Sequence, residues 1–146
     1  MAVVLRYCVL ALLALPGLAA AQEGALGRWR TIDDNTGKPR SIVEVYETGN
    51  GTAAARVLRV LDPGKPEPLC DKCRGERRGK PVVGMVIAWN LRPSGERLEG
   101  GSILDPDNGK IYSVRMTPVA GGQKLEVRGF VGIALLGRTQ VWLREH

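Results

Sequence analysis

The 146-residue sequence predicts an all-β protein whose strands close into an eight-stranded antiparallel up-and-down barrel after an N-terminal signal peptide. Two observations support this fold class. Apolar residues recur at every second position through most of the chain, most clearly in segments 83–89 and 112–116, and no long stretch has helical periodicity. Turn-forming segments separate these runs at short intervals, so consecutive strands are expected to be joined mostly by hairpins.

Alternation and turn signals place the strands in order. The eight expected strands cover residues 26–32, 41–47, 51–61, 82–90, 97–104, 111–118, 124–131 and 139–145. "DDNTGKP" separates the first two strands, "TGNG" leads into the third, and "RPSGE", "DPDNGK" and "VAGGQ" separate the later ones. Asn108-Gly109 is typical of a hairpin tip, because both residues tolerate the positive φ of tight hairpins.

Barrel closure follows from the number and order of the strands. Eight consecutive antiparallel strands leave exposed edges unless the sheet closes on itself. A sandwich is the alternative, but it usually needs several long crossing connections. Only the connection Asp62–Pro81 is long here, so the barrel is favoured.

The first 21 residues have the three parts of a secretory signal. Arg6 supplies the positive charge, Cys8 begins an apolar run too short to span a bilayer, and small residues precede a cleavage site after Ala21. A retained membrane anchor is the alternative. We expect a single mature domain of residues 22–146, without a transmembrane span, in the periplasm or secreted.

The chain is basic, with a formal charge of +6 from 21 Lys and Arg against 15 Asp and Glu. An exported chain rarely meets nucleic acid, so nucleic acid is not an expected partner. Most basic runs are merely solvated loops. The functional alternative is a surface for an envelope protein or anionic lipid headgroups, held by electrostatics. Its candidate residues are Lys72, Arg74, Arg77 and Arg78.

Cys70 and Cys73 are the only cysteines left after cleavage, and an even count in an oxidising compartment predicts a disulfide. A haem tether needs His directly after the second cysteine, where Arg74 stands. Zinc needs four ligands, and the only histidine is His146, so no metal is expected. A redox centre is disfavoured because glycines and a proline after Cys73 oppose the helix that lowers a thiol pKa.

No catalytic arrangement is recognisable, so the protein is not expected to be an enzyme or to need a cofactor. His146 is the last residue, so a Ser-His-Asp arrangement cannot be anchored. No phosphate-binding loop has the usual spacing. The carboxylate pairs Asp33-Asp34 and Asp105/Asp107 lie in turns, where aspartates ordinarily accept backbone hydrogen bonds.

Four motifs in order, "GRW", "PLCDKCRG", "GGSILDPDNGKIY" and "VRGFVGIALLGRTQVWLR", resemble those of bacterial exported proteins grouped as domain of unknown function family 2147. The resemblance implies a lipocalin-like fold. The segment "GRW" also resembles the Gly-x-Trp motif that opens lipocalin barrels. That likeness implies that Trp29 seals the closed end of the barrel and that Arg144, on the last strand, packs across the indole.

An eight-stranded barrel is either filled by side chains or holds one small ligand. Aromatic residues make up only 5% of the chain, which favours a cavity that binds a small apolar molecule. The expected lining residues are Met85, Ile87, Trp89, Tyr112, Val114 and Met116. The alternative is that these residues are plain core and that the protein acts through the Asp62–Pro81 loop. We expect the apolar run 133–136 to plug one end of the barrel; an exposed patch is the alternative.

Overall fold

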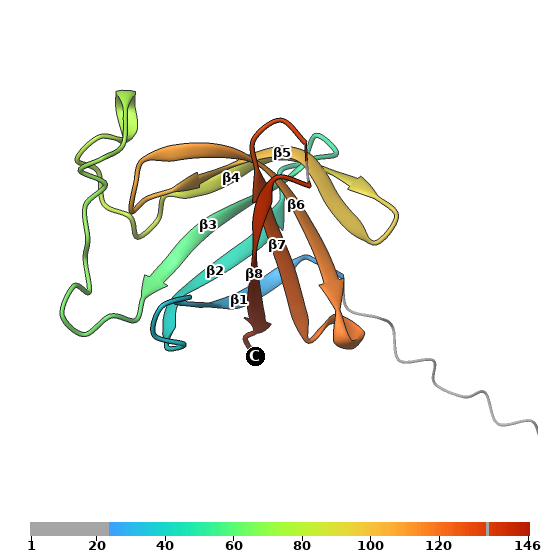
Figure 1. Ribbon diagram of the computed structural model, residues 1–146, viewed down its shortest axis with the longest axis horizontal. Helices are drawn as coiled ribbons and strands as arrows, with labels where there is room; N and C mark the ends of the chain where they lie inside the picture. Colours follow the sequence, from blue (N-terminus) through green and yellow to red (C-terminus); the bar gives the residue numbers. More distant parts are fainter. Residues whose placement is uncertain (1–23, 134) are drawn as a thin grey trace, which may run out of the picture.

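The computed structural model describes residues 24–133 and 135–146. Eight strands in sequential order form a closed antiparallel barrel in which the first strand pairs with the last (Figure 1). The predicted fold class is therefore confirmed. The predicted signal peptide and its cleavage site lie outside the described residues. No helix in the described part of the chain is long and apolar enough to cross a membrane.

Every predicted strand is present, within a few residues of its expected bounds. The strands are β1 (Gly27–Ile32), β2 (Pro39–Glu47), β3 (Ala53–Val60), β4 (Val86–Ser94), β5 (Arg97–Asp105), β6 (Lys110–Val119), β7 (Lys124–Phe130) and β8 (Gly137–Arg144). The largest displacement is in β4, expected at 82–90. Gly84 has a φ of 86°, which ends regular pairing on that side, so the strand begins later.

A bulge in β4 changes which side chains face the barrel interior. Ala55 of β3 is paired with Ala88, whereas the next residue of β3, Arg56, is paired with Val86. Ile87 is thus an extra residue on β4, and the alternation shifts by one position after it. Trp89 consequently lies on the outer face, so its predicted inward orientation is wrong.

The strand order places the connections at two ends of the barrel, because consecutive antiparallel strands reverse direction. The β1–β2, β3–β4, β5–β6 and β7–β8 connections lie at one end, which we call the mouth. The β2–β3, β4–β5 and β6–β7 turns lie at the other. Figure 1 shows the long β3–β4 connection in green, extending away from the sheet on the mouth side.

The end opposite the mouth is sealed around Trp29, which is fully buried. Its indole Nε1 donates a hydrogen bond of 2.9 Å to the Ala25 carbonyl oxygen. The Arg144 guanidinium carbon lies 4.1 Å from the centroid of the Trp29 ring. Arg144 also donates hydrogen bonds to the carbonyl oxygens of Leu26, Gly24 and Gly122, at 2.9, 2.6 and 2.6 Å.

These contacts tie three pieces of chain together at the sealed end. They join the segment before β1, the η2 turn (Ala120–Gly122) between β6 and β7, and the end of β8. A guanidinium stacked on an indole contributes about 0.5–2 kcal/mol, and more as the pair loses water. The geometry is the one implied for Trp29 and Arg144 by the lipocalin resemblance.

The long β3–β4 connection is an ordered arm whose base contains the two cysteines. Cys70 and Cys73 form a disulfide, with Cα atoms 5.3 Å apart, and both residues are buried. Leu69 and Pro81 pair as an isolated antiparallel bridge, so the two sides of the arm run together. The short 3₁₀ helix η1 (Gly75–Arg77) forms its tip.

The arm is packed against the β5–β6 hairpin through Gly109. A Cβ atom added to Gly109 would lie 1.9 Å from the Lys72 carbonyl oxygen, and Gly109 has a φ of 70°. The Cys70 Sγ atom lies 3.6 Å from the Pro106 carbonyl oxygen. The disulfide therefore stiffens the part of the arm that touches the hairpin.

Replacing Gly109 with alanine is expected to destabilise the protein more than the same change at Gly95. Both glycines have positive φ, which costs a non-glycine residue about 1–3 kcal/mol. A Cβ atom at Gly95 meets nothing within 4 Å, whereas at Gly109 it meets backbone that cannot rotate away. Overpacking there adds about 1–3 kcal/mol. Equal free energies of unfolding in urea for G109A and G95A would contradict this contact.

Replacing both Cys70 and Cys73 with alanine is expected to lower the free energy of unfolding by about 2 kcal/mol, because the ring they close is small. The larger effect should be local. Basic residues of the arm are sites for trypsin, and cleavage there should be faster in the double variant than in the native protein. Unchanged cleavage kinetics would mean that the packing against Gly109 holds the arm without the disulfide.

Candidate functional site

A cavity of about 770 Å³ opens at the mouth of the barrel. Its floor is apolar because the inward-facing residues of six strands meet there. The floor residues are Val43, Val57, Ile87, Ile103, Val127 and Trp142. Most of them are buried, and only Ile103 is partly exposed. The floor therefore offers aliphatic and indole surface to a molecule that enters from the mouth.

The rim of the cavity is charged. The residues lining it include six aspartates, Asp33, Asp34, Asp62, Asp71, Asp105 and Asp107, and four basic residues, Arg40, Lys65, Lys72 and Arg138. They come from the connections at the mouth and the strand ends beside them. The rim thus has a small excess of negative charge, although the protein as a whole is basic.

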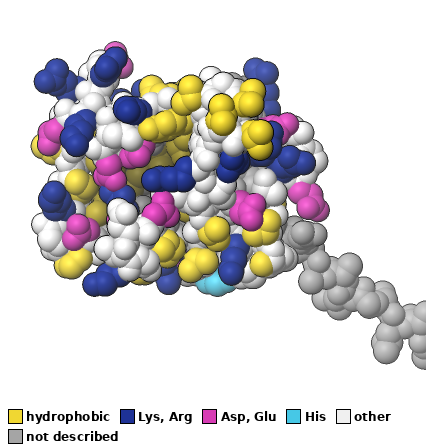
Figure 2. All heavy atoms as spheres, viewed as in Figure 1, with side chains coloured by type: hydrophobic (Ala, Val, Ile, Leu, Met, Phe, Trp, Pro, Cys, Tyr) yellow, Lys and Arg dark blue, Asp and Glu magenta, His cyan; other side chains and the backbone are white. Residues whose placement is uncertain are grey.

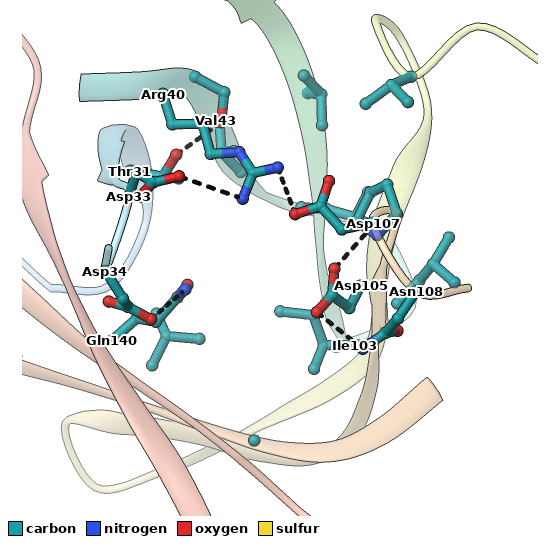
Figure 3. A pocket seen from close by; sticks show the side chains of 18 of the residues that line it. Thr31, Asp33, Asp34, Arg40, Val43, Ile103, Asp105, Asp107, Asn108 and Gln140 are labelled. Atoms are coloured by element: carbon teal, nitrogen blue, oxygen red, sulfur yellow. Dashed lines mark hydrogen bonds and ion pairs between the residues drawn. The ribbon is translucent and has the colours of Figure 1, made fainter. Parts of the chain in front are cut away.

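Arg40 spans the mouth between two of these connections. Its guanidinium donates a hydrogen bond to the Asp107 carboxylate, and its Nη1 lies 4.0 Å from the Asp33 Oδ2 atom (Figure 3). The hydrogen bond to Asp107 raises the pKa of Arg40 above its usual value, against the opposing effect of partial burial. The contact links the β1–β2 side of the rim to the β5–β6 hairpin.

The position and the pKa of the Asp33 carboxylate are set mainly by the backbone of its own turn. Its carboxylate accepts hydrogen bonds from the backbone N–H groups of Asn35 and Thr36, at 2.8 and 2.9 Å. These hydrogen bonds, led by that of Thr36, lower the pKa of Asp33 below its usual 3.8. Asp33 is therefore a stable anion opposite Arg40 at neutral pH.

A second set of polar contacts joins the rim to the floor. The Gln140 Nε2 atom donates a hydrogen bond of 3.1 Å to the Asp34 carboxylate (Figure 3). The Gln140 Oε1 atom accepts a hydrogen bond of 3.4 Å from the Trp142 indole. Arg138 lies 3.5 Å from the same Asp34 carboxylate. Gln140 thus fixes the indole that forms part of the apolar floor.

The comparisons with known proteins agree with this geometry. Residues 27–144 match the model of a family described as an uncharacterized protein conserved in bacteria, domain of unknown function 2147. The chain belongs to this family. Among curated proteins, no match to the sequence was found.

One solved structure is similar to this chain over most of its length. It is protein HP1028 from the human pathogen Helicobacter pylori, described as belonging to the lipocalin family. The two chains are 25% identical, the TM-score is 0.74, and the match covers 85% of this chain and 84% of that one. The member of the domain 2147 family described here therefore has a lipocalin-like barrel, as the sequence motifs imply.

The predicted lining residues fall into three groups. Ile87 and Tyr112 line the cavity. Val114 and Met116 are fully buried in the barrel interior and do not line it. Met85 and Trp89 lie elsewhere. Met85 is buried at the base of the arm, beside a shallow depression that Arg77 also lines. Trp89 lies on the outer face, with the Arg77 guanidinium carbon 4.4 Å from its ring centroid.

Tyr112 carries a polar group at the edge of the cavity. Its hydroxyl accepts a hydrogen bond of 3.1 Å from the Asn108 Nδ2 atom. Asn108 also donates to Asp105, at 3.2 Å, so the hairpin tip holds the phenol in place. Tyr112 thus places a hydroxyl group beside the apolar floor.

Most of the floor residues lie outside the set expected from the sequence. The residues that line the cavity but were not expected are Val43, Val57, Ile103, Val127 and Trp142. Their signal was the same alternation that placed β4 and β6, since each of them points inward on its own strand. The expected residues all come from segments 83–89 and 112–116, where the alternation is clearest, so the inward-facing residues of the other strands were not included.

The basic residues of the arm have different surroundings and do not form one cluster. Lys72 lines the cavity and Arg77 stacks on Trp89, whereas Arg74 and Arg78 are exposed on the arm. Among the described residues, no group of three or more His, Cys, Asp and Glu side chains is arranged to hold a metal ion.

The expectation that the run 133–136 plugs the barrel is wrong for its described residues. Ile133, Leu135 and Leu136 are 59%, 82% and 70% exposed in the β7–β8 loop, and Val131 before them is 69% exposed. Position 134 lies outside the described residues. Leu136 and Val131 touch the rim of the cavity, but the loop does not fill it.

Proposed function

We propose that this protein is an exported binding protein that carries a small, largely apolar molecule in the cavity at the mouth of its barrel. The observation that carries this proposal is the cavity itself. Its volume of about 770 Å³ lies within the roughly 300–1,000 Å³ typical of small-molecule sites. The similarity to a lipocalin-family protein supports a binding role, and the signal-like first 21 residues support export.

The arrangement of the lining suggests the kind of molecule. An apolar body would rest on the valines, isoleucines and Trp142 of the floor, where burial contributes about 25 cal/mol per Å². Its polar end would meet the rim. Because aspartates outnumber basic residues there, a neutral or cationic end should be favoured over an anionic one.

The structure gives less support to the alternative of a filled barrel that acts only through the arm. The barrel is open at its mouth, and Arg77 of the arm is engaged with Trp89. The same mouth offers a concave apolar surface of the usual size for a ligand. The cavity therefore accounts for more of the observed features than the arm does.

The first test is native mass spectrometry of the unreduced protein purified from the periplasm of an expressing bacterium. Extra non-covalent mass that is lost on gentle activation would support the carrier role and give the mass of the ligand. A second test titrates the purified protein with the neutral dye N-phenyl-1-naphthylamine and follows the dye emission. A protein that is bare in the spectrum and leaves the dye emission unchanged would overturn the proposal.

The preference for the polar end can be measured by displacing this dye with amphiphiles of equal chain length. We expect an alkyl amine or alcohol to displace the dye at lower concentration than the matching carboxylate. Added salt should narrow the difference, since salt screens the rim charges. Displacement by the carboxylate at the lowest concentration would contradict the assignment of the rim.

A further inference from the structure

The β7–β8 loop carries a cluster of exposed aliphatic side chains that the cavity does not use. We call Val131, Ile133, Leu135 and Leu136 the apolar tip. Each is more than half exposed, and together they are the largest such group among the described residues. Single exposed aliphatic residues are ordinary, but a contiguous cluster on a protruding loop marks an interaction site.

The backbone holds this tip out from the barrel. Gly137 begins β8 so close to β7 that an added Cβ atom would lie 2.5 Å from the Gly129 carbonyl oxygen. Arg128 donates a hydrogen bond of 3.1 Å to the Leu135 carbonyl oxygen, so its cationic side chain reaches the base of the tip. The two strands are clamped together at the point where the loop leaves them, and the aliphatic side chains stand beyond it.

Positive charge accompanies the apolar tip on the same side of the molecule. Residues 70–80 of the arm contain five Lys and Arg against two Asp and Glu. Figures 1 and 2 show the arm and the β7–β8 loop reaching the same upper edge of the view, with basic side chains over the arm and hydrophobic ones over the loop. A flat surface lying along this edge would touch both, whatever their separation in depth.

We infer that this edge is a membrane-contact surface, with the apolar tip inserted among the lipids and the arm held to anionic headgroups. Aliphatic side chains that enter the headgroup region and basic residues that face anionic lipid are the two contributions that hold peripheral proteins on bilayers. Arg74 and Arg78 are exposed and placed for the second role. The partner is therefore an anionic phospholipid bilayer.

The apolar tip lies next to the opening of the cavity. Val131 and Leu136 belong both to the tip and to the rim of the cavity. A membrane held at the tip would lie beside the cavity opening, so an apolar molecule could pass between bilayer and barrel with little exposure to water. This last step rests on the proposed carrier function, whereas the membrane contact itself does not.

Co-sedimentation with lipid vesicles tests the contact. Wild-type protein should bind vesicles of phosphatidylglycerol and phosphatidylcholine and should bind pure phosphatidylcholine much less. The double variant Ile133→Ser, Leu135→Ser should lose about tenfold or more in binding, because two aliphatic side chains no longer leave water. Neither residue lines the cavity, so this variant should still bind N-phenyl-1-naphthylamine.

The matched control is Leu26→Ser, Val141→Ser, which changes two exposed aliphatic residues away from the loop and should bind vesicles like wild type. The variant Arg74→Gln, Arg78→Gln should weaken binding about fivefold per arginine at low salt. In addition, the emission of Leu135→Trp should shift to shorter wavelength on anionic vesicles, whereas that of Leu26→Trp should not.

Three results would overturn the inference: no binding of wild type to anionic vesicles, equal binding of the tip variant and wild type, or no spectral shift for Leu135→Trp. If wild type does not bind anionic vesicles, the apolar tip would instead be a candidate contact for a protein partner. Loss of dye binding with vesicle binding intact would instead count against the carrier function alone.

Discussion

Replacing Trp29 with alanine is expected to lower the free energy of unfolding by about 3–5 kcal/mol, the usual cost of removing a large buried aromatic side chain. Trp29 is fully buried, donates a hydrogen bond to Ala25 and supports the guanidinium of Arg144. The change removes the buried indole, its hydrogen bond to Ala25 and the ring on which Arg144 stacks, and it leaves a cavity at the sealed end. Urea unfolding followed by far-UV circular dichroism measures the loss.

The matched control is Trp89→Ala. An arginine, Arg77, also stacks on the ring of Trp89, but Trp89 lies on the outer face and is only partly buried. We therefore expect a clearly smaller loss for this variant. Similar losses for the two variants would contradict a special contribution of the contacts of Trp29 to stability.

Replacing Val127 with tryptophan is expected to abolish binding in the cavity, with affinity for N-phenyl-1-naphthylamine reduced at least a hundredfold, or about 2.7 kcal/mol. Val127 lies on the floor and is buried, so an indole at this position would occupy the space of the bound molecule. Because the cavity is open, the larger side chain can be accommodated there without displacing the packed interior. Dye titration measures the affinity, and circular dichroism checks the fold.

Val141→Trp provides the control for this variant. Val141 lies on the neighbouring strand β8 but is 42% exposed and does not line the cavity. The variant V141W adds the same side chain to the outside of the barrel and should leave dye binding unchanged. Native-like affinity in V127W would place the bound molecule outside the cavity described here.

The fold could be predicted because alternation and turn chemistry are local signals. Asn108-Gly109 forms the hairpin tip that its residue types require, with Gly109 at a φ of 70°. The face of Trp89 could not be predicted in the same way. One extra residue, Ile87, reverses the alternation, and a bulge depends on pairing with β3 and not on the sequence of β4 alone.

The rim of the site was even less accessible to prediction. Asp33 and Asp107 each look like an ordinary turn residue, and Asp33 does accept the backbone hydrogen bonds expected of one. Only barrel closure brings Arg40 to Asp107, which lies 67 residues away in the sequence. Likewise, the exposure of Leu135 depends on what the rest of the chain places beside the loop. The sequence of an apolar run is the same whether the run is buried or exposed, so its exposure could not be predicted.

The contacts of Arg144 also bear on the order of folding. Two registered pairs, Trp29 with Arg144 and Arg30 with Leu143, join β1 to β8. The hydrogen bond from Arg144 to Leu26 spans 118 residues. Contacts of such high sequence separation are slow to form, because the entropy of closing the loop is lost before the contact stabilises it. We therefore expect the β1–β8 seam to be the last part of the sheet to assemble. Until Arg144 reaches the Trp29 ring, a nascent chain would then present two unpaired strand edges to its neighbours.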